Sequence, residues 1–224
     1  MPYSTDRLIY GVAHSDVRPV TFIDTQGKRK SFIWYQKWKG MITRCYDPKS
    51  LERNPTYNGC SVCDEWLYAS KFKQWYESQG EVDNLVLDKD FLSEDNKIYS
   101  PETCLLITQE MNHLMVKVKN SDDRGFLPVG VTYFPNYKFK QYVAHLSIGG
   151  RRKTLGYYPT PEEAYQAYLL AKVNHIKTLF ASIDELLVVD EMKNKIKIGL
   201  ESAIQYLNTM STNTHWPLCY DMLR

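Results

Sequence analysis

The chain of 224 residues is long enough for one large domain or two small ones with buried cores. Hydrophobic residues make up 43% of it and charged residues 24%, which excludes an intrinsically disordered chain. The formal net charge is only +2, so a surface for a polyanion must come from local clusters of Lys and Arg. Such clusters occur at 28–30, 37–44, 138–140 and 151–153, and each one alone is equally compatible with a solvated charged face.

No segment reaches the roughly 18 consecutive apolar residues of a membrane span. Residues 1–16 lack the apolar core of a signal peptide. We therefore expect a cytoplasmic protein with no membrane partner. The five cysteines are an odd number, which favours reduced thiols or a metal site over disulfides.

Short strands followed by helices are predicted for the N-terminal third of the chain. Apolar alternation over residues 7–33, interrupted by the turn-forming TQGKRK, indicates strands, and residues 35–46 have helical character. The stretch 47–60 is rich in Pro, Asn and Gly and predicts a loop. Residues 61–80 bring four aromatic residues close to helical spacing and stop at Gly80, so we interpret these aromatics as core residues. They are Trp66, Phe72, Trp75 and Tyr76.

Residues 84–115 predict a strand, a polar loop, a second strand and a helix, in that order. The apolar segments LVL and TCLLIT are the strands, and Thr108 is a suitable cap for the helix. Taken alone, the acidic loop between the strands reads more simply as a solvated surface loop. The polar, turn-rich stretch 118–128 follows and is interpreted as a domain linker.

The remainder of the chain predicts a three-stranded antiparallel sheet and two helices. Three strand-like runs lie within residues 129–158. Thr160 as cap and Pro161 at the first helical position, followed by two glutamates, mark a helix start. A second helix is expected at about 183–207.

Three stretches of residues 34–115 carry a resemblance to a known family. They are WYQKWKGMITRCY, NPTYNGCSVCDEWLYASKFKQW and LVLDKD…NKIYSPETCLLITQEMNHL, in that order. Together they resemble the HNH endonucleases common in bacteriophages. The resemblance implies a ββα-metal nuclease lobe, in which one divalent cation stabilises the charge that builds on the phosphodiester.

The resemblance assigns site residues position by position. Asp88 on the first strand and Asn112 on the helix fall on the two metal-binding positions, and their oxygen donors suit Mg²⁺ or Mn²⁺. Lys89 falls on the position of the general-base histidine, and Thr103 on that of an asparagine that braces the loop. His113 points elsewhere, because neighbouring helical residues diverge by about 100°.

The lysine at position 89 changes the expected chemistry. A lysine with an ordinary pKa, near 10.4, is protonated at pH 7 and cannot accept a proton from water. Lys89 can instead stabilise negative charge near the scissile phosphate. Loss of the base would lower the rate by roughly 10²- to 10⁴-fold without abolishing metal and DNA binding. We therefore expect an active nuclease, with a catalytically weakened or inactive DNA-binding relative as the alternative.

The C-x-x-C pair Cys60 and Cys63 leaves two interpretations open. With Cys45 and Cys104 it would complete a four-thiolate structural zinc site. The turn glycines typical after a zinc knuckle are missing, however, and buried free cysteines are common core residues. We favour free thiols.

Four features in order mark residues 129–176: Gly130-Val131, YVAHL, LGYY and TPEEAYQAY. They resemble the DNA-binding domain of APETALA and ethylene-response-factor plant regulators, a domain also fused to phage HNH nucleases. The resemblance implies a sheet that lies in the DNA major groove with a helix on its other face. Strand alternation then turns Tyr142, Ala144 and Leu146 toward the helix and Gln141, Val143, His145 and Ser147 toward DNA.

The side chains assigned to DNA are Thr132, Lys138, Lys140, Gln141, His145, Arg151, Arg152, Lys153 and Thr154. The basic ones mainly grip phosphates, which positions the protein without specifying a sequence. A small sheet with a solvated basic edge is the alternative interpretation.

We therefore expect an α+β protein, phage-encoded and acting in the bacterial cytoplasm as a homing-like HNH endonuclease on double-stranded DNA. One alternative is a sequence-specific DNA-binding or regulatory protein without catalysis. Another is a protein that binds a host defence or replication protein through its nuclease lobe. A monomer is expected. The expected parts are a nuclease lobe (1–117), a linker (118–128), a DNA-binding domain (129–180) and a C-terminal helix and tail (181–224).

Overall fold

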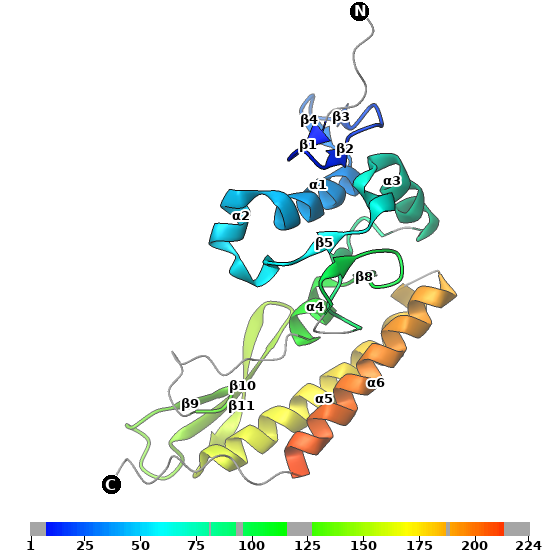
Figure 1. Ribbon diagram of the computed structural model, residues 1–224. Helices are drawn as coiled ribbons and strands as arrows, with labels where there is room; N and C mark the ends of the chain where they lie inside the picture. The colour runs from blue at the N-terminus through cyan, green and yellow to red at the C-terminus, as the bar shows by residue number, and fades with distance from the viewer. Residues whose placement is uncertain (1–7, 81, 93–95, 116–126, 187–188, 213–224) are drawn as a thin grey trace, which may run out of the picture. The chain divides into compact units, whose positions relative to one another are not determined.

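The described chain forms two compact units (Figure 1). The computed structural model describes residues 8–80, 82–92, 96–115, 127–186 and 189–212. The first unit contains residues up to Thr108 together with Glu185–Ile196, and the second contains Gln109–Asp184 and the residues from Lys197 onward. Small sheets and helices occur in both, so the α+β class is confirmed. Most of the expected linker, 118–128, lies outside the described residues.

Two short hairpins precede the first helix, as the alternation over 7–33 predicts. β1 (Leu8–Ile9) pairs with β2 (Ala13–His14), and β3 (Thr21–Ile23) pairs with β4 (Arg29–Ser31), both antiparallel. The turn after β3 is closed by Asp24 Oδ1, which accepts backbone hydrogen bonds from residues 26 and 28 at 2.9 and 2.8 Å.

Residues 48–57, which the sequence predicted as loop, are largely helical. α1 (Ile33–Tyr46) is followed by α2 (Pro48–Arg53) and the 3-10 turn η1 (Pro55–Tyr57). The prediction of a loop over 47–60 was wrong for these residues, because a proline at the first helical position starts each of them. Residues 61–80 form β5 (Ser61–Val62), a second 3-10 turn, η2 (Asp64–Leu67), and α3 (Ala69–Ser78).

Aromatic side chains form the core of the first unit. Trp38 and Phe72 are fully buried, and Trp66 is nearly so. The Trp38 indole donates a 2.8 Å hydrogen bond to the Trp66 carbonyl, and the rings of Trp66 and Phe72 meet edge to face at 5.0 Å. The interpretation as core is therefore confirmed for Trp66, Phe72 and Tyr76, whereas Trp75 is half-buried and packs on Trp66 and Phe72.

Three short strands surround the expected site residues of the first unit: Asp88 ends the first of them, Lys89 directly follows it, and Thr103 lies in the turn between the other two. β6 (Val86–Asp88) pairs antiparallel with β8 (Leu105–Ile107), with Asp88 opposite Leu105. β7 (Ile98–Tyr99), which the sequence did not predict, pairs in parallel with β5. α4 (Gln109–Met115) follows β8 and belongs to the second unit. The predicted order of strand, loop, strand and helix is confirmed.

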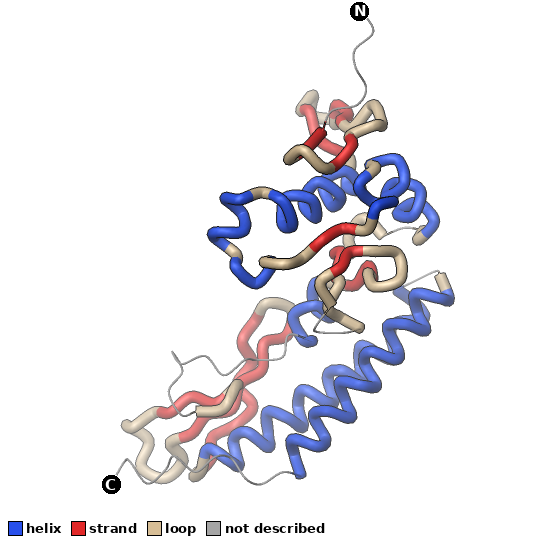
Figure 2. The backbone as a smooth tube through the Cα atoms, in the orientation of Figure 1, coloured by secondary structure: helices blue, strands red, loops and turns tan. Residues whose placement is uncertain are grey.

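The second unit contains the predicted three-stranded sheet (Figure 2). β9 (Val131–Tyr133), β10 (Tyr142–Ile148) and β11 (Arg151–Tyr158) are antiparallel, with β10 at the centre. The two-residue turn between β10 and β11 consists of Gly149 and Gly150, with φ of +56° and +75°, a conformation that glycine adopts readily. The β10–β11 register shifts after Ala144, where a bulge interrupts the ladder.

Two long helices follow the sheet, and most of each belongs to the second unit. Thr160 caps α5 (Pro161–Leu186), because its hydroxyl accepts the Glu163 N–H at 3.2 Å. The first helix was expected to end before residue 183, but it continues to Leu186, because no Gly or Pro interrupts residues 162–186. The second helix, α6, spans Asp190–Thr212. The helices run side by side (Figure 1), joined by paired hydrogen bonds between Gln166 and Ser211.

The sheet packs on α5 through small side chains. Val131, Ala144 and Ala164 form the buried centre, and Tyr142 packs against it, so the predicted orientation of Tyr142 and Ala144 is confirmed. Gly130, with φ of +76°, lies so close to α5 that a Cβ atom there would be 2.2 Å from the Tyr168 ring. Among the described helices, none combines the length and the apolar character that a membrane crossing needs.

Candidate active site and nucleic-acid interface

Asp88 is held at the end of β6 by the loop that follows it. Its Oδ1 accepts backbone hydrogen bonds from Asp90 at 2.9 Å and from Phe91 at 2.7 Å. No hydrogen bond of Oδ2 to another described residue is present. Burial is the largest influence on the carboxyl group and raises its pKa above the usual value, and the nearby Asp90 carboxylate acts in the same direction. One oxygen thus orients the carboxylate while the other can bind a ligand.

Lys89 points into the loop and is only 5% exposed. Its ammonium group forms an ion pair with Asp90 and donates a 2.9 Å hydrogen bond to the Asn96 carbonyl. It also lies 5.8 Å from the centre of the Tyr99 ring. These contacts occupy the ammonium group with the protein itself, so its geometry is that of a residue that holds the loop in place.

Asn96 completes this loop, and the sequence interpretation missed it. Its amide donates to the carbonyls of Lys89 at 2.9 Å and Ile98 at 2.8 Å, and its Oδ1 accepts the Ile98 N–H at 3.1 Å. Thr103, the expected bracing residue, also donates to the Ile98 carbonyl, at 2.7 Å. An asparagine just before a short strand is the signal that could have identified this role, because Asn commonly bonds to neighbouring backbone.

Asn112, the second expected metal ligand, is half-buried on α4. It belongs to the second unit, whereas Asp88 belongs to the first. α4 is joined to α5 by a 2.9 Å contact between Glu110 Oε1 and His175 Nε2. His113 on the same helix is exposed and contacts Gln109 at 2.7 Å.

Only part of the expected metal site can be tested against the geometry. In the ranges that the structure describes, no group of three or more His, Cys, Asp or Glu side chains is arranged to hold a metal ion. Asp88 alone fits the role of a carboxylate ligand, because Oδ2 is available and oxygen donors suit Mg²⁺ or Mn²⁺. Asn112 as its partner stays a prediction.

The four cysteines of the possible zinc site lie in the first unit as free thiols. Burial raises the pKa of Cys45 to about 11 and that of Cys104 to about 12. It also raises the pKa of Cys63 above its usual value. Zinc binds thiolates, and burial disfavours the loss of the proton from Cys45, Cys63 and Cys104.

On the exposed face of the sheet, four of the side chains assigned to DNA come together. Arg152 on β11 reaches across β10, and its Nη2 donates a 2.8 Å hydrogen bond to the Thr132 hydroxyl on β9. Between them, His145 Nδ1 lies 3.4 Å from the Thr154 hydroxyl. Burial, followed by the charge of Arg152, lowers the pKa of His145 below its usual value. The imidazole Nε2 is buried without a hydrogen-bond partner in the described structure.

Two residues expected to face DNA behave differently. Val143 is 2% exposed, so its assignment to an open DNA face was wrong. It lies on the central strand, opposite Thr132 on β9 and Tyr157 on β11. The Gln141 side chain donates to the Pro135 carbonyl at 3.4 Å and thereby contributes to the β9–β10 loop.

The charged side chains of the sheet and its loops are all basic. Residues 127–158 contain five Lys and Arg residues and no Asp or Glu, although the whole chain has 28 basic and 26 acidic residues. The five are Lys138, Lys140, Arg151, Arg152 and Lys153, and all are exposed. This segment is therefore strongly cationic in a nearly neutral protein.

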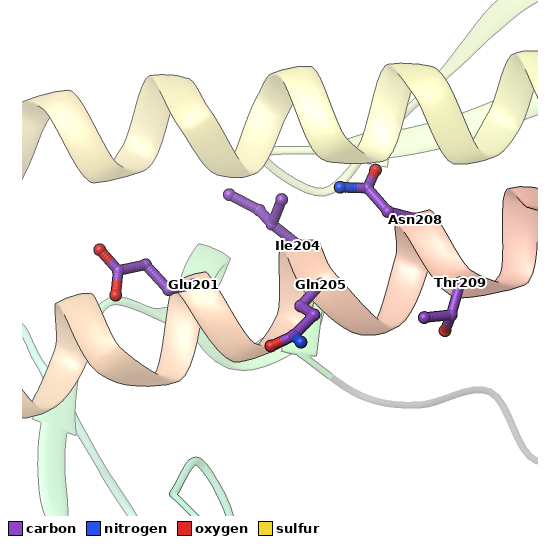
Figure 3. Close-up of a pocket in the computed structure, with 5 residues that line it drawn as sticks. All are labelled: Glu201, Ile204, Gln205, Asn208 and Thr209. Atoms are coloured by element: carbon purple, nitrogen blue, oxygen red, sulfur yellow. The ribbon is translucent and has the colours of Figure 1, made fainter.

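Two cavities lie away from these residues. One, of about 900 Å³, is formed by residues 8–39 and is lined by Arg18 and Lys39 among others. The second, of about 420 Å³, lies along α6, where the side chains of Ile204 and Asn208 extend toward α5 (Figure 3). Neither is lined by a residue of the expected site.

Comparison with known proteins gives no relative: no family model matches the chain, and neither does any curated protein or solved structure.

Proposed function

We propose that this protein binds double-stranded DNA through the β9–β11 sheet and hydrolyses it with a divalent metal at Asp88, as an endonuclease of the HNH kind. The observation that carries the proposal is the sheet segment 127–158, which has five basic residues and no acidic one. Clustered cations on a sheet attract the phosphates of a nucleic acid, whereas a neutral chain as a whole does not.

The exposed sheet face supplies two kinds of DNA contact. The lysines and Arg151 suit phosphate oxygens, which set the position of the protein on the duplex. Arg152 has the planar fork that reads guanine, and its bond to Thr132 holds the fork over the sheet. His145, whose lowered pKa favours the neutral imidazole, adds no charge to this face, and its Nδ1 lies beside the Thr154 hydroxyl.

The hydrolytic part of the proposal rests on Asp88. Mg²⁺ or Mn²⁺ would stabilise the charge that develops on the phosphoryl and leaving oxygens. Asp88 Oδ2 is the proposed ligand, and the two backbone hydrogen bonds to Oδ1 orient the carboxylate. Lys89 donates to Asn96 and pairs with Asp90, so it positions the loop beside Asp88 instead of accepting a proton. Hydrolysis is accordingly expected to be slow.

Cleavage of supercoiled plasmid tests this proposal. The wild-type protein is incubated with Mg²⁺ or Mn²⁺ beside Asp88→Ala and the control Asp64→Asn, which changes an exposed carboxylate of the same unit. We expect nicking by the wild type and by Asp64→Asn, and none by Asp88→Ala, which should still bind the DNA. Equal cleavage by all three proteins would exclude Asp88 as the site.

A DNA-binding protein without catalysis is the second candidate function. It is favoured by Lys89, whose ammonium group stands in place of a base and is occupied by Asp90 and Asn96. DNA binding that persists with no cleavage in either metal would support this alternative.

A further inference from the structure

Phe139 lies in the loop between β9 and β10 with 86% of its side chain exposed, more than any other large apolar side chain that the structure describes. An aromatic ring in water forgoes the free energy that its burial would provide. A ring exposed to this degree is therefore suited to contact a partner.

The loop that carries Phe139 is well braced. Its ends are closed by a 2.7 Å hydrogen bond from the Phe134 N–H to the Gln141 carbonyl. The Tyr137 ring packs edge to face on Phe134 at 5.8 Å and on Tyr157 of β11 at 5.4 Å. These contacts fix the loop on the sheet, while residues 138–140, between Tyr137 and β10, are exposed.

The charges around the ring indicate what kind of partner it fits. Lys138 and Lys140 flank Phe139, and neither forms an ion pair with a described residue. The whole segment 127–158 has no carboxylate that would repel a phosphate. An aromatic ring between two free ammonium groups matches nucleic acid, where bases stack on the ring while phosphates meet the cations.

We propose that Phe139 is a wedge that inserts between adjacent base pairs of double-stranded DNA, while Lys138 and Lys140 contact phosphates on either side. The inference rests on the proposed DNA binding and specifies how the sheet engages its target. Insertion of an apolar side chain unstacks a base step and kinks the duplex. The flexible TA and CA/TG steps unstack most easily, so the wedge is expected to prefer them.

Fluorescence of 2-aminopurine, which rises when the base is unstacked, tests the wedge. Duplexes carrying 2-aminopurine at a TA step are titrated with the full chain in EDTA, so that no cleavage occurs, and anisotropy records binding. The wild type and Phe139→Trp should raise the fluorescence. Phe139→Ala should bind roughly 10-fold more weakly and give no rise. Leu170→Ala, which removes a 64% exposed apolar side chain from α5, should behave as the wild type.

The outcomes separate the wedge from the proposed function. If the wild type and Phe139→Ala bind DNA with equal affinity and neither raises the fluorescence, the wedge is overturned and the proposed DNA binding still holds. No binding by the wild type would overturn both. Loss of binding to phosphatidylserine vesicles in Phe139→Ala, with DNA binding unchanged, would assign the ring to a lipid surface instead. Unchanged thermal unfolding of Phe139→Ala shows that the fold is intact.

Discussion

Lys89 and Asn96 hold each other through reciprocal hydrogen bonds. The Lys89 ammonium donates to the Asn96 carbonyl at 2.9 Å, and the Asn96 amide donates to the Lys89 carbonyl, also at 2.9 Å. The pair closes the loop that begins with Asp88. Lys89, for which the sequence resemblance predicts the place of a general base, is thus a structural part of the loop.

Removal of either member of this pair should destabilise the protein. Lys89→Met leaves the Asn96 carbonyl without its lysine donor. Asn96→Ala leaves the Lys89 carbonyl without its amide donor and the Ile98 carbonyl with Thr103 alone. Each substitution is expected to lower the free energy of unfolding by about 1–3 kcal/mol, measured by denaturant unfolding. The two substitutions remove different hydrogen bonds of the same loop, because each side chain donates to the other residue's backbone carbonyl. The double variant should lose less than the sum of the two, since the first loss already loosens the loop that the second bond holds. Strict additivity would show that the two bonds act independently.

Asp88→Asn is expected to abolish nicking and to raise stability at pH 7. The amide oxygen can still accept the two backbone hydrogen bonds. Burial raises the pKa of Asp88 in the folded protein, so the ionised carboxylate is less favourable there than in the unfolded chain.

The sign of the pH dependence follows from this shift. The penalty of the charged wild-type group is present above the raised pKa and vanishes below the unfolded value, about 3.9. The melting temperature of Asp88→Asn should therefore exceed that of the wild type at pH 7 and approach it as the pH falls toward 4. A variant less stable than the wild type at pH 7 would show that the carboxylate stabilises the loop.

Gly130→Ala tests how closely the sheet approaches α5. A Cβ atom at this position would lie 2.2 Å from the Tyr168 ring. Gly150→Ala is the matched control, because its φ of +75° nearly equals the +76° of Gly130 but no atom lies near its Cβ position. The control should lose about 1–2 kcal/mol of stability from backbone strain alone. Gly130→Ala should lose about 1–3 kcal/mol more, and equal losses would contradict the close packing.

Arg152 and Lys153 should contribute differently to DNA binding. Arg152 is held by Thr132 over the sheet face, so Arg152→Ala is expected to reduce discrimination between sequences by about 1–3 kcal/mol. Lys153→Ala should weaken all sequences alike and lower the salt dependence of binding by about one charge. Salt titrations followed by fluorescence anisotropy measure both effects. Thr132→Val removes the hydroxyl that holds Arg152, so it should reproduce part of the loss of discrimination seen in Arg152→Ala. If Arg152→Ala and Lys153→Ala change affinity and salt dependence in the same way, a specific role for Arg152 is excluded.

The local pattern of the sequence was sufficient for several elements. Alternation predicted β9, β10 and β11 and the inward side of Tyr142 and Ala144, because residues two apart in a strand share a face. Thr160 and Pro161 predicted the start of α5, because capping depends only on neighbouring backbone. Three aromatic residues of the first unit, Trp66, Phe72 and Tyr76, were recognised as core from their spacing.

What the sequence by itself determined are the properties that depend on near neighbours: strand alternation, helix starts, and the uneven charge of residues 127–158. Only the tertiary structure decided that Lys89 is buried against Asn96, that Val143 is covered within its sheet, and that Arg152 reaches Thr132 across a strand. These relationships join residues whose contact depends on how the loop closes and on the strand register. The physical reason is that burial and long-range hydrogen bonds depend on the packing of distant segments, which local periodicity does not encode.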